Sequence, residues 1–104
     1  MTVAVVTSLA QLKETIASGA AVAVDFWATW CGPCRAISPI FERLSTETKG
    51  VTFLKCDVDE QAEVAQEFGI RAMPTFMFFK GGEKVDEIVG ANPGKLQTAI
   101  ASLA

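Results

Sequence analysis

Histidine is missing from this chain of 104 residues, and cysteine occurs only at positions 31, 34 and 56. A zinc site built on two cysteines needs two further ligands, and the one remaining cysteine cannot supply both. Three cysteines also do not make the disulfide framework of a small secreted protein. They indicate instead a catalytic dithiol in a reducing compartment.

Positive charge and long apolar runs are scarce as well. Nine Lys and Arg residues against twelve Asp and Glu residues give a net charge of −3, which argues against nucleic acid and anionic membranes as partners. No apolar run approaches the roughly 20 residues of a membrane span, and no signal-peptide pattern follows Met1. We expect a cytoplasmic protein, with a processed organellar form as the open alternative.

Hydrophobic residues, by contrast, make up half of the chain. At this length, such a composition supports one hydrophobic core and leaves no room for a separate cofactor domain. No repeat, linker or low-complexity segment divides the sequence. We therefore expect a single domain over residues 1–104 that acts as a monomer.

Apolar periodicity predicts alternating strands and helices. The predicted strands are Val3–Val6, Ala21–Trp27, Val51–Cys56, Thr75–Phe79 and Lys84–Val89. Helices are predicted after Ser8, after the cysteine pair, after Asp59 and after Asn92. Two glycines between the last two strands favour an antiparallel hairpin. The order β-α-β-α-β-α-β-β-α predicts an α/β fold with a mixed central sheet and helices on both faces.

Residues 30–34 read Trp-Cys-Gly-Pro-Cys and come between a buried strand and a helix. Unpaired backbone N–H groups and the helix dipole favour an anion at a helix N-terminus, so the Cys31 thiolate should form readily. Cys34, one turn into the helix, should be more shielded. Pro33 is tolerated in a first turn, where its missing N–H costs little.

Two thiols in this arrangement fit thiol–disulfide exchange. Cys31 suits the attack on a substrate disulfide, and Cys34 suits the resolution of the mixed disulfide that forms. A permanent structural disulfide is the alternative, although a link over so few residues would stabilise the fold little.

Asp25 is a carboxylate within an apolar strand. Strand alternation places it on the face of Ala21 and Ala23, where desolvation would raise its pKa and make it a proton acceptor near neutrality. The alternative is an exposed aspartate at a strand end. Lys55 raises the same question in the next strand, where it shares a face with Val51 and Phe53 or lies solvated on an edge strand.

Several segments together resemble the thioredoxin family. They are residues 25–34, Met73-Pro74-Thr75, the hairpin at residues 80–83 and residues 89–93, and the resemblance spans essentially the whole chain. Residues 53–59 and 90–93 look closer to its eukaryotic cytosolic branch. The resemblance implies the thioredoxin fold and a general protein-disulfide reductase active in electron transport and cell redox homeostasis. It also implies that the chain binds no cofactor and that NADPH reduces it through a flavoprotein thioredoxin reductase.

The resemblance further assigns roles to single residues. Asp25 would take the proton of Cys34, Lys55 would pair with Asp25, and Pro74 would follow a cis peptide bond beside the dithiol. A small apolar docking surface would consist of Thr29, Trp30, Gly32, Pro33, Met73, Gly90 and Ala91, although turn chemistry alone also explains its glycine and alanine members. Trp27 would pack in the core.

Partners implied by the resemblance are thioredoxin reductase and disulfide-bearing targets of the peroxiredoxin, methionine sulfoxide reductase and ribonucleotide reductase types. One alternative is a disulfide oxidase or isomerase, which usually carries histidine at the position of Pro33. Another is a noncatalytic subunit whose surface docks a partner. Cys56 should pack as a small hydrophobe, with a regulatory or dimer-forming thiol as the alternative.

Overall fold

A computed structural model describes residues 2–104. The strands of this range are β1 (Val3–Val5), β2 (Ala21–Trp27), β3 (Val51–Asp57), β4 (Thr75–Lys80) and β5 (Glu83–Val89). Its helices are α1 (Leu9–Ala17), α2 (Gly32–Glu47), α3 (Ala62–Glu67) and α4 (Pro93–Leu103). The element order is the predicted one. No helix of residues 2–104 has both the length and the apolar character needed to cross a bilayer.

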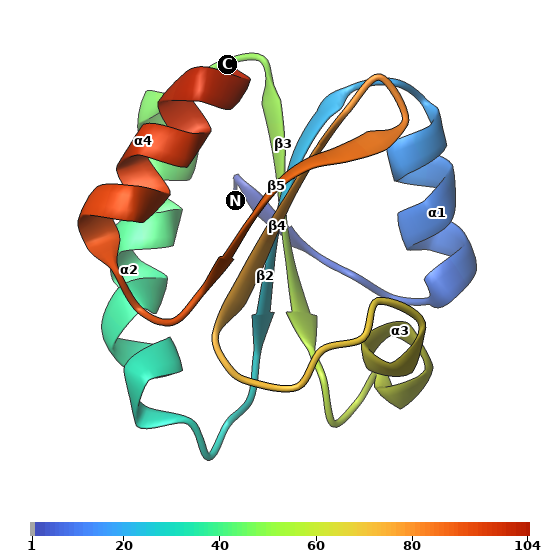
Figure 1. Ribbon diagram of the computed structural model, residues 1–104, viewed down its shortest axis with the longest axis vertical. Helices are drawn as coiled ribbons and strands as arrows, with labels where there is room; N and C mark the ends of the chain where they lie inside the picture. The colour runs from blue at the N-terminus through green and yellow to red at the C-terminus, as the bar shows by residue number, and fades with distance from the viewer. Residues whose placement is uncertain (1) are drawn as a thin grey trace.

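The strands form one mixed sheet in the order β1-β3-β2-β4-β5. β3 runs parallel to β1 and β2, whereas β4 is antiparallel to both β2 and β5. Helices α1 and α3 cover one face, and α2 and α4 cover the other, as predicted (Figure 1). The carboxyl ends of β2 and β3 point to the lower end of this view, where α2 begins.

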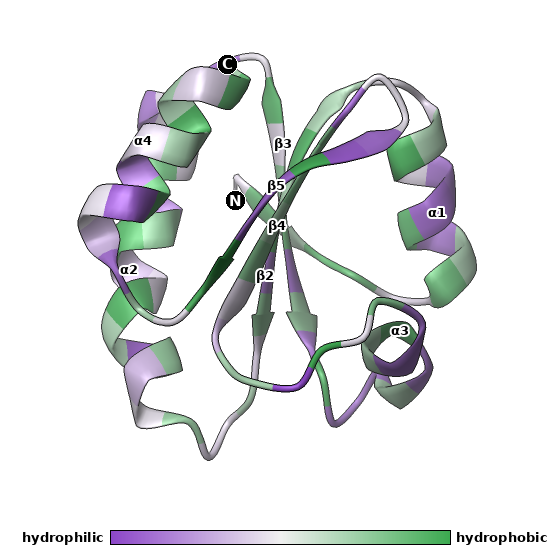
Figure 2. Cartoon of the chain, viewed as in Figure 1, coloured by the Kyte–Doolittle hydropathy of each residue, from purple (hydrophilic) through white to green (hydrophobic). Residues whose placement is uncertain are grey.

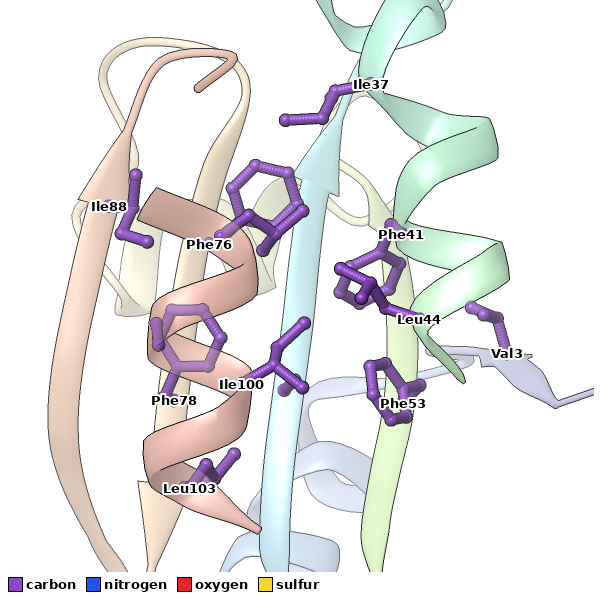
Figure 3. Close-up of a cluster of buried hydrophobic side chains, with 13 residues drawn as sticks. Val3, Ile37, Phe41, Leu44, Phe53, Phe76, Phe78, Ile88, Ile100 and Leu103 are labelled. Atoms are coloured by element: carbon purple, nitrogen blue, oxygen red, sulfur yellow. The ribbon is translucent and has the colours of Figure 1, made fainter. Parts of the chain in front are cut away.

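Strand alternation divides the core into two apolar clusters. On the α2 and α4 side, phenylalanines from β3 and β4 meet the inner faces of both helices (Figure 3). This cluster contains Phe53, Phe76, Phe78, Ile37, Phe41 and Ile100 among others. On the α1 and α3 side, Val22, Val24 and Phe26 of β2 pack with Leu12 and Val64. The side chains of β2 thus contribute to both layers.

Strand β5 forms an edge of the sheet and is mostly exposed. Figure 2 shows its hairpin end in the hydrophilic colour, and charged residues on an edge strand oppose pairing with a second chain. Gly81 and Gly82 have φ values of 66° and 86°, which suit the tight hairpin turn that the sequence predicts.

Two helices begin as predicted. The Ser8 hydroxyl accepts a hydrogen bond from the backbone N–H of Gln11 at 3.0 Å, and the Asn92 side chain accepts one from Lys95 at 3.0 Å. Each side chain satisfies one of the free N–H groups of the first turn.

The predicted capping of α3 by Asp59 is wrong. Helix α3 follows Gln61, which makes no side-chain capping bond. The carboxylate of Asp57 instead accepts hydrogen bonds from the backbone N–H groups of Asp59 and Glu60, at 2.9 and 3.4 Å. The Asp59 carboxylate, which does not cap the helix, accepts a hydrogen bond from the Trp30 indole N–H.

Candidate active site

The cysteine pair lies where β2 ends and α2 begins. Cys31 is the N-cap of α2, and its Sγ accepts a hydrogen bond from the backbone N–H of Cys34 at 3.2 Å. Gly32 and Pro33 occupy the first turn, as predicted. The two cysteines form a disulfide in this structure. Because an N–H group and the helix dipole both point at Cys31 Sγ, this sulfur is placed to carry negative charge after reduction.

Apolar groups surround the disulfide. Cys31 and Cys34 are 5% and 2% exposed, and they form a small cluster with Ala28. Met73 and Trp27 pack against that cluster. The Met73–Pro74 peptide bond is cis, as the resemblance implies. Because Met73 packs against the two cysteines, the loop before β4 lies beside the dithiol.

Asp25 is buried on the same face of β2 as the dithiol helix, with 3% of its surface exposed. In register it pairs with Lys55 of β3 and Phe76 of β4. The exposed strand-end alternative for Asp25 is therefore wrong. The edge-strand alternative for Lys55 is also wrong, because β3 lies between β1 and β2.

A pocket of about 100 Å³ lies between this carboxyl group and Cys34. Its lining residues are Asp25, Trp27, Cys34, Arg35, Ser38 and Lys55. Desolvation raises the pKa of Asp25 from 3.8 to about 7, and the charge of Lys55 partly opposes this rise. Asp25 can therefore accept or release a proton near neutral pH, as the sequence predicts.

Trp30 lies at the rim of the site with 66% of its surface exposed. Its indole N–H donates to Asp59 Oδ2 at 2.9 Å, which holds the ring against the loop after β3. On the other side, Arg35 Nη1 donates to the backbone carbonyl of Thr29 at 2.7 Å. These two bonds tie the loop before α2 to its surroundings.

Gly90 belongs to the loop after β5, and Ala91 follows it. The Gly90 N–H donates to the carbonyl of Pro74 at 2.8 Å, so this loop and the Met73–Pro74 loop are joined. Gly90 has a φ of 104°, a conformation that explains the glycine without a binding role. The fold thus places the predicted docking residues on three loops and on the first turn of α2, at one end of the sheet.

Cys56 faces the opposite cluster. It is fully buried among Phe26, Leu54 and Val64, and packs as a small hydrophobe, as predicted. Burial, with the nearby Asp57 and Asp25 charges, raises its pKa to about 12. Its thiol is therefore unreactive in the folded protein.

Four neighbours of the dithiol were not assigned to the site from the sequence. Trp27 was expected in the core, but it lines the pocket, and its Nε1 has no hydrogen-bond partner within residues 2–104. Ser38 had a usable signal, because it follows Cys34 by four residues and so shares its helix face. Arg35 and Asp59 had none, since their hydrogen-bond partners depend on loop geometry.

Metal-binding side chains do not gather here. Over residues 2–104, no group of three or more His, Cys, Asp or Glu residues is placed to hold a metal ion. What the site does offer is a sulfur pair at a helix N-terminus, a neighbouring proton acceptor and an apolar rim. That combination performs thiol–disulfide exchange.

Comparison with known proteins extends the resemblance to the whole chain. The family model described as "Thioredoxin" matches residues 3–102. A thioredoxin of Malassezia sympodialis is 56% identical over 100 residues, which cover 94% of this chain and 95% of that protein. The crystal structure of Malassezia sympodialis thioredoxin matches with a TM-score of 0.92 and 54% identity, covering 98% of this chain and 94% of that chain.

A further solved structure comes from work on the thiol-resolving mechanism of yeast mitochondrial 1-Cys peroxiredoxin via the glutathione and thioredoxin systems. It has a TM-score of 0.92 and 37% identity, and covers 96% of this chain and 94% of that chain. None of these matches favours a disulfide oxidase, an isomerase or a noncatalytic subunit. With more than half of the residues shared over nearly the full length of a thioredoxin, and with the same fold, this chain belongs to the thioredoxin family and is a general protein-disulfide reductase.

Proposed function

We propose that Cys31 is the attacking thiol and Cys34 the resolving thiol of this reductase. The Cys31 thiolate attacks one sulfur of a target disulfide, forms a mixed disulfide and releases the other target sulfur as a thiolate. Cys34 then loses its proton and attacks Cys31 Sγ. The Cys31–Cys34 bond forms, the bond to the target breaks, and the second target sulfur leaves as a thiolate. Two electrons have then passed from the dithiol to the target.

The observation that carries this assignment is the N-cap position of Cys31. Its sulfur accepts the N–H of Cys34 at 3.2 Å, so the helix stabilises its thiolate and not that of Cys34. The more deeply buried Cys34 needs a local base. Asp25 lines the same pocket and acts as that base, while Lys55 adjusts its pKa.

Target chains bind to the docking surface defined above. Trp30, Thr29 and Met73 offer side chains at its rim, and the loop of Pro74 offers backbone groups to an extended segment. Gly90 and Ala91 border that loop without side chains that would block it. Recognition through the main chain makes few demands on target sequence, which fits a reductase with many substrates.

Regeneration of the dithiol requires an outside reductant, because each turnover leaves Cys31 and Cys34 joined in a disulfide. We propose a flavoprotein thioredoxin reductase that uses NADPH, with the chain acting as a monomeric single domain in the cytoplasm. Peroxiredoxins, methionine sulfoxide reductases and ribonucleotide reductases are the proposed targets. The similarity to the structure from the yeast peroxiredoxin work supports the first of these classes.

The decisive experiment is insulin reduction in the presence of NADPH and a thioredoxin reductase. NADPH consumption should be rapid for the parent protein and absent for Cys31→Ser. Cys34→Ser should accumulate a mixed disulfide with insulin, visible by mass spectrometry. Equal turnover by the parent and Cys31→Ser would overturn the assignment. So would a mixed disulfide trapped on Cys34 in Cys31→Ser with none on Cys31 in Cys34→Ser.

A further inference from the structure

Ser38 lies on α2, one turn after Cys34, and lines the pocket that holds the Asp25 carboxyl group. Helical hydroxyl groups usually bond back to the preceding turn, and several in this protein do so. Those of Thr15, Ser45, Thr46 and Thr98 donate to backbone carbonyls at 2.5 to 3.0 Å. The Ser38 hydroxyl has no such bond within residues 2–104, so it is available for hydrogen bonds in the pocket.

Two residues that line this pocket, Asp25 and Trp27, each carry a buried polar atom with unmet hydrogen-bonding capacity. Within the described chain, Asp25 Oδ1 and Trp27 Nε1 have no partner. The pocket volume of about 100 Å³ is several times the roughly 10–15 Å³ that one water needs. A polar passage therefore reaches from Asp25 toward Ser38 in an otherwise apolar layer.

The chemistry of the lining residues singles out Ser38 as the group that can pass a proton. The indole of Trp27 and the charged side chains of Arg35 and Lys55 only donate hydrogen bonds. Cys34 is the source of the proton, and Asp25 is its first acceptor. Only the Ser38 hydroxyl can accept and donate at once without changing its own charge.

We propose that Ser38 is a positioning residue that carries the proton of Asp25 between this buried carboxyl group and solvent. The inference rests on the proposed role of Asp25 and extends it. When Cys34 attacks Cys31, its proton passes to Asp25. Asp25 then releases one proton along the hydrogen bonds of Ser38, and the hydroxyl receives one proton for each that it gives up. The reverse transfer returns a proton to Cys34 during reduction of the disulfide.

The charged groups around Asp25 shape the pH dependence of this step. Lys55 faces it from β3, and Cys34 and Arg35 face the same pocket from α2. The neighbour on β4 is Phe76, which does not titrate. Below neutral pH Asp25 holds its proton. Release of this proton to solvent is therefore slow at low pH, and it depends most on Ser38 under these conditions.

The test uses Ser38→Ala and Ser38→Thr, with Ser102→Ala as the matched control. Within residues 2–104, Ser102 is also a helical serine whose hydroxyl makes no bond to the preceding turn, but it lines a groove between β5 and α4. Pre-reduced protein is mixed with excess insulin, quenched with acid at set times and alkylated, and single-turnover oxidation is followed from about pH 5.5 to 8.5. Melting temperatures of all variants check the fold.

Ser38→Ala should oxidise roughly threefold to tenfold more slowly near pH 6 and approach the parent rate above pH 8, a small part of what acid–base catalysis supplies. Ser38→Thr, which keeps the hydroxyl, should restore most of the rate, and Ser102→Ala should match the parent. A parental pH profile in Ser38→Ala would overturn the proposal. So would an equal slowing at every pH that threonine does not restore, because that result indicates packing alone.

Asp25→Asn separates this proposal from the function on which it rests. In the asparagine variant the oxidation rate should no longer change with pH through the titration of Asp25. Adding Ser38→Ala to this variant should cause no further slowing, because the effects of two substitutions in one proton path do not add. A parental profile in Asp25→Asn would refute the role of Asp25 and the relay with it. Loss of the step in Asp25→Asn but not in Ser38→Ala would refute the relay alone.

Discussion

Cys34 and Cys56 are almost equally hidden, at 2% and 0% exposure, yet their surroundings differ in every respect that matters for reactivity. Cys34 lies in the first turn of α2, bonded to Cys31 and lining a pocket with a carboxyl group and two cationic residues. Cys56 lies on β3 among apolar side chains of the opposite layer. The charges that act on its thiol are those of the Asp57 and Asp25 carboxylates, which disfavour a thiolate.

The difference shows that burial does not by itself make a thiol inert. A thiol reacts when the structure stabilises its thiolate or supplies a base, and both are available only at the N-terminus of α2. The end of β3 offers neither, and two carboxylates further raise the Cys56 pKa. The two cysteines of this small core therefore differ in reactivity because of their position relative to one helix terminus.

The largest contrast should appear in alkylation of the reduced protein. With iodoacetamide near pH 6, Cys31 should react roughly a thousandfold or more faster than Cys56, whose pKa near 12 leaves almost no thiolate. Peptide mapping by mass spectrometry measures both rates in one sample. Denatured protein is the control, in which the two rates should converge. An ordinary thiol pH profile for Cys31 would contradict the helix-terminus argument.

Asp25→Asn should have the next largest effect, on both turnover and stability. Insulin reduction should fall roughly tenfold to a hundredfold near neutrality, within the range of general acid–base catalysis. The free energy of unfolding, by contrast, should rise. Because folding raises the pKa of Asp25 from 3.8 to about 7, the folded protein binds more protons in this window and loses stability as pH rises through it.

The asparagine variant lacks this loss of stability. Its free energy of unfolding should exceed that of the parent at pH 8, by at most roughly 4 kcal/mol, and the gain should vanish toward pH 4. Urea unfolding at several pH values measures it, with Asp86→Asn on the exposed strand β5 as the control. A variant that is less stable than the parent at pH 8 would show that desolvation does not dominate at Asp25.

A smaller effect is expected at the rim of the site. Asp59→Ala removes the acceptor of the Trp30 indole N–H, worth roughly 0.5–1.5 kcal/mol, and should raise the KM for insulin about twofold to threefold. The kcat should not change, because Asp59 does not touch the sulfurs. Asp59→Asn, which keeps an acceptor oxygen, should behave like the parent. A change in kcat alone would mean that the bond acts on the chemical step.

Cys56→Ser should have the smallest effect on turnover, namely none. The serine hydroxyl would be buried without a designed partner, so the free energy of unfolding should fall by about 1–3 kcal/mol. Insulin assays and urea unfolding of the same preparation measure both quantities. A large loss of activity in protein shown to be folded would give Cys56 a role in turnover and remove the contrast with Cys34.

Much of this molecule follows from local patterns in the sequence. The element order, the two layers and the capping of α1 and α4 depend on periodicity and on neighbours three or four residues apart. The position of Cys31 at a helix N-terminus follows in the same way. Even the burial of Asp25 is foreseeable, because the residues on both sides of it are apolar.

The errors and omissions share one cause. Asp59 was expected to cap α3, but it binds Trp30, which is 29 residues away. Arg35 binds the carbonyl of Thr29 across a loop. Trp27 lines the pocket, and its buried indole N–H has no partner within residues 2–104. Each contact depends on how loops pack against one another, and local sequence patterns do not predict that packing.

The sequence by itself determined the strand and helix order, the redox pair and the helix terminus that activates it, because these depend on periodicity and short spacing. Only the tertiary structure decided the register of Asp25 with Lys55 and the meeting of three loops around the dithiol. It also decided the pocket that joins Asp25, Cys34 and Ser38. The physical reason is that these relations depend on strand pairing and on packing between segments far apart in the chain. The local pattern of apolar and polar residues does not specify which of these segments meet.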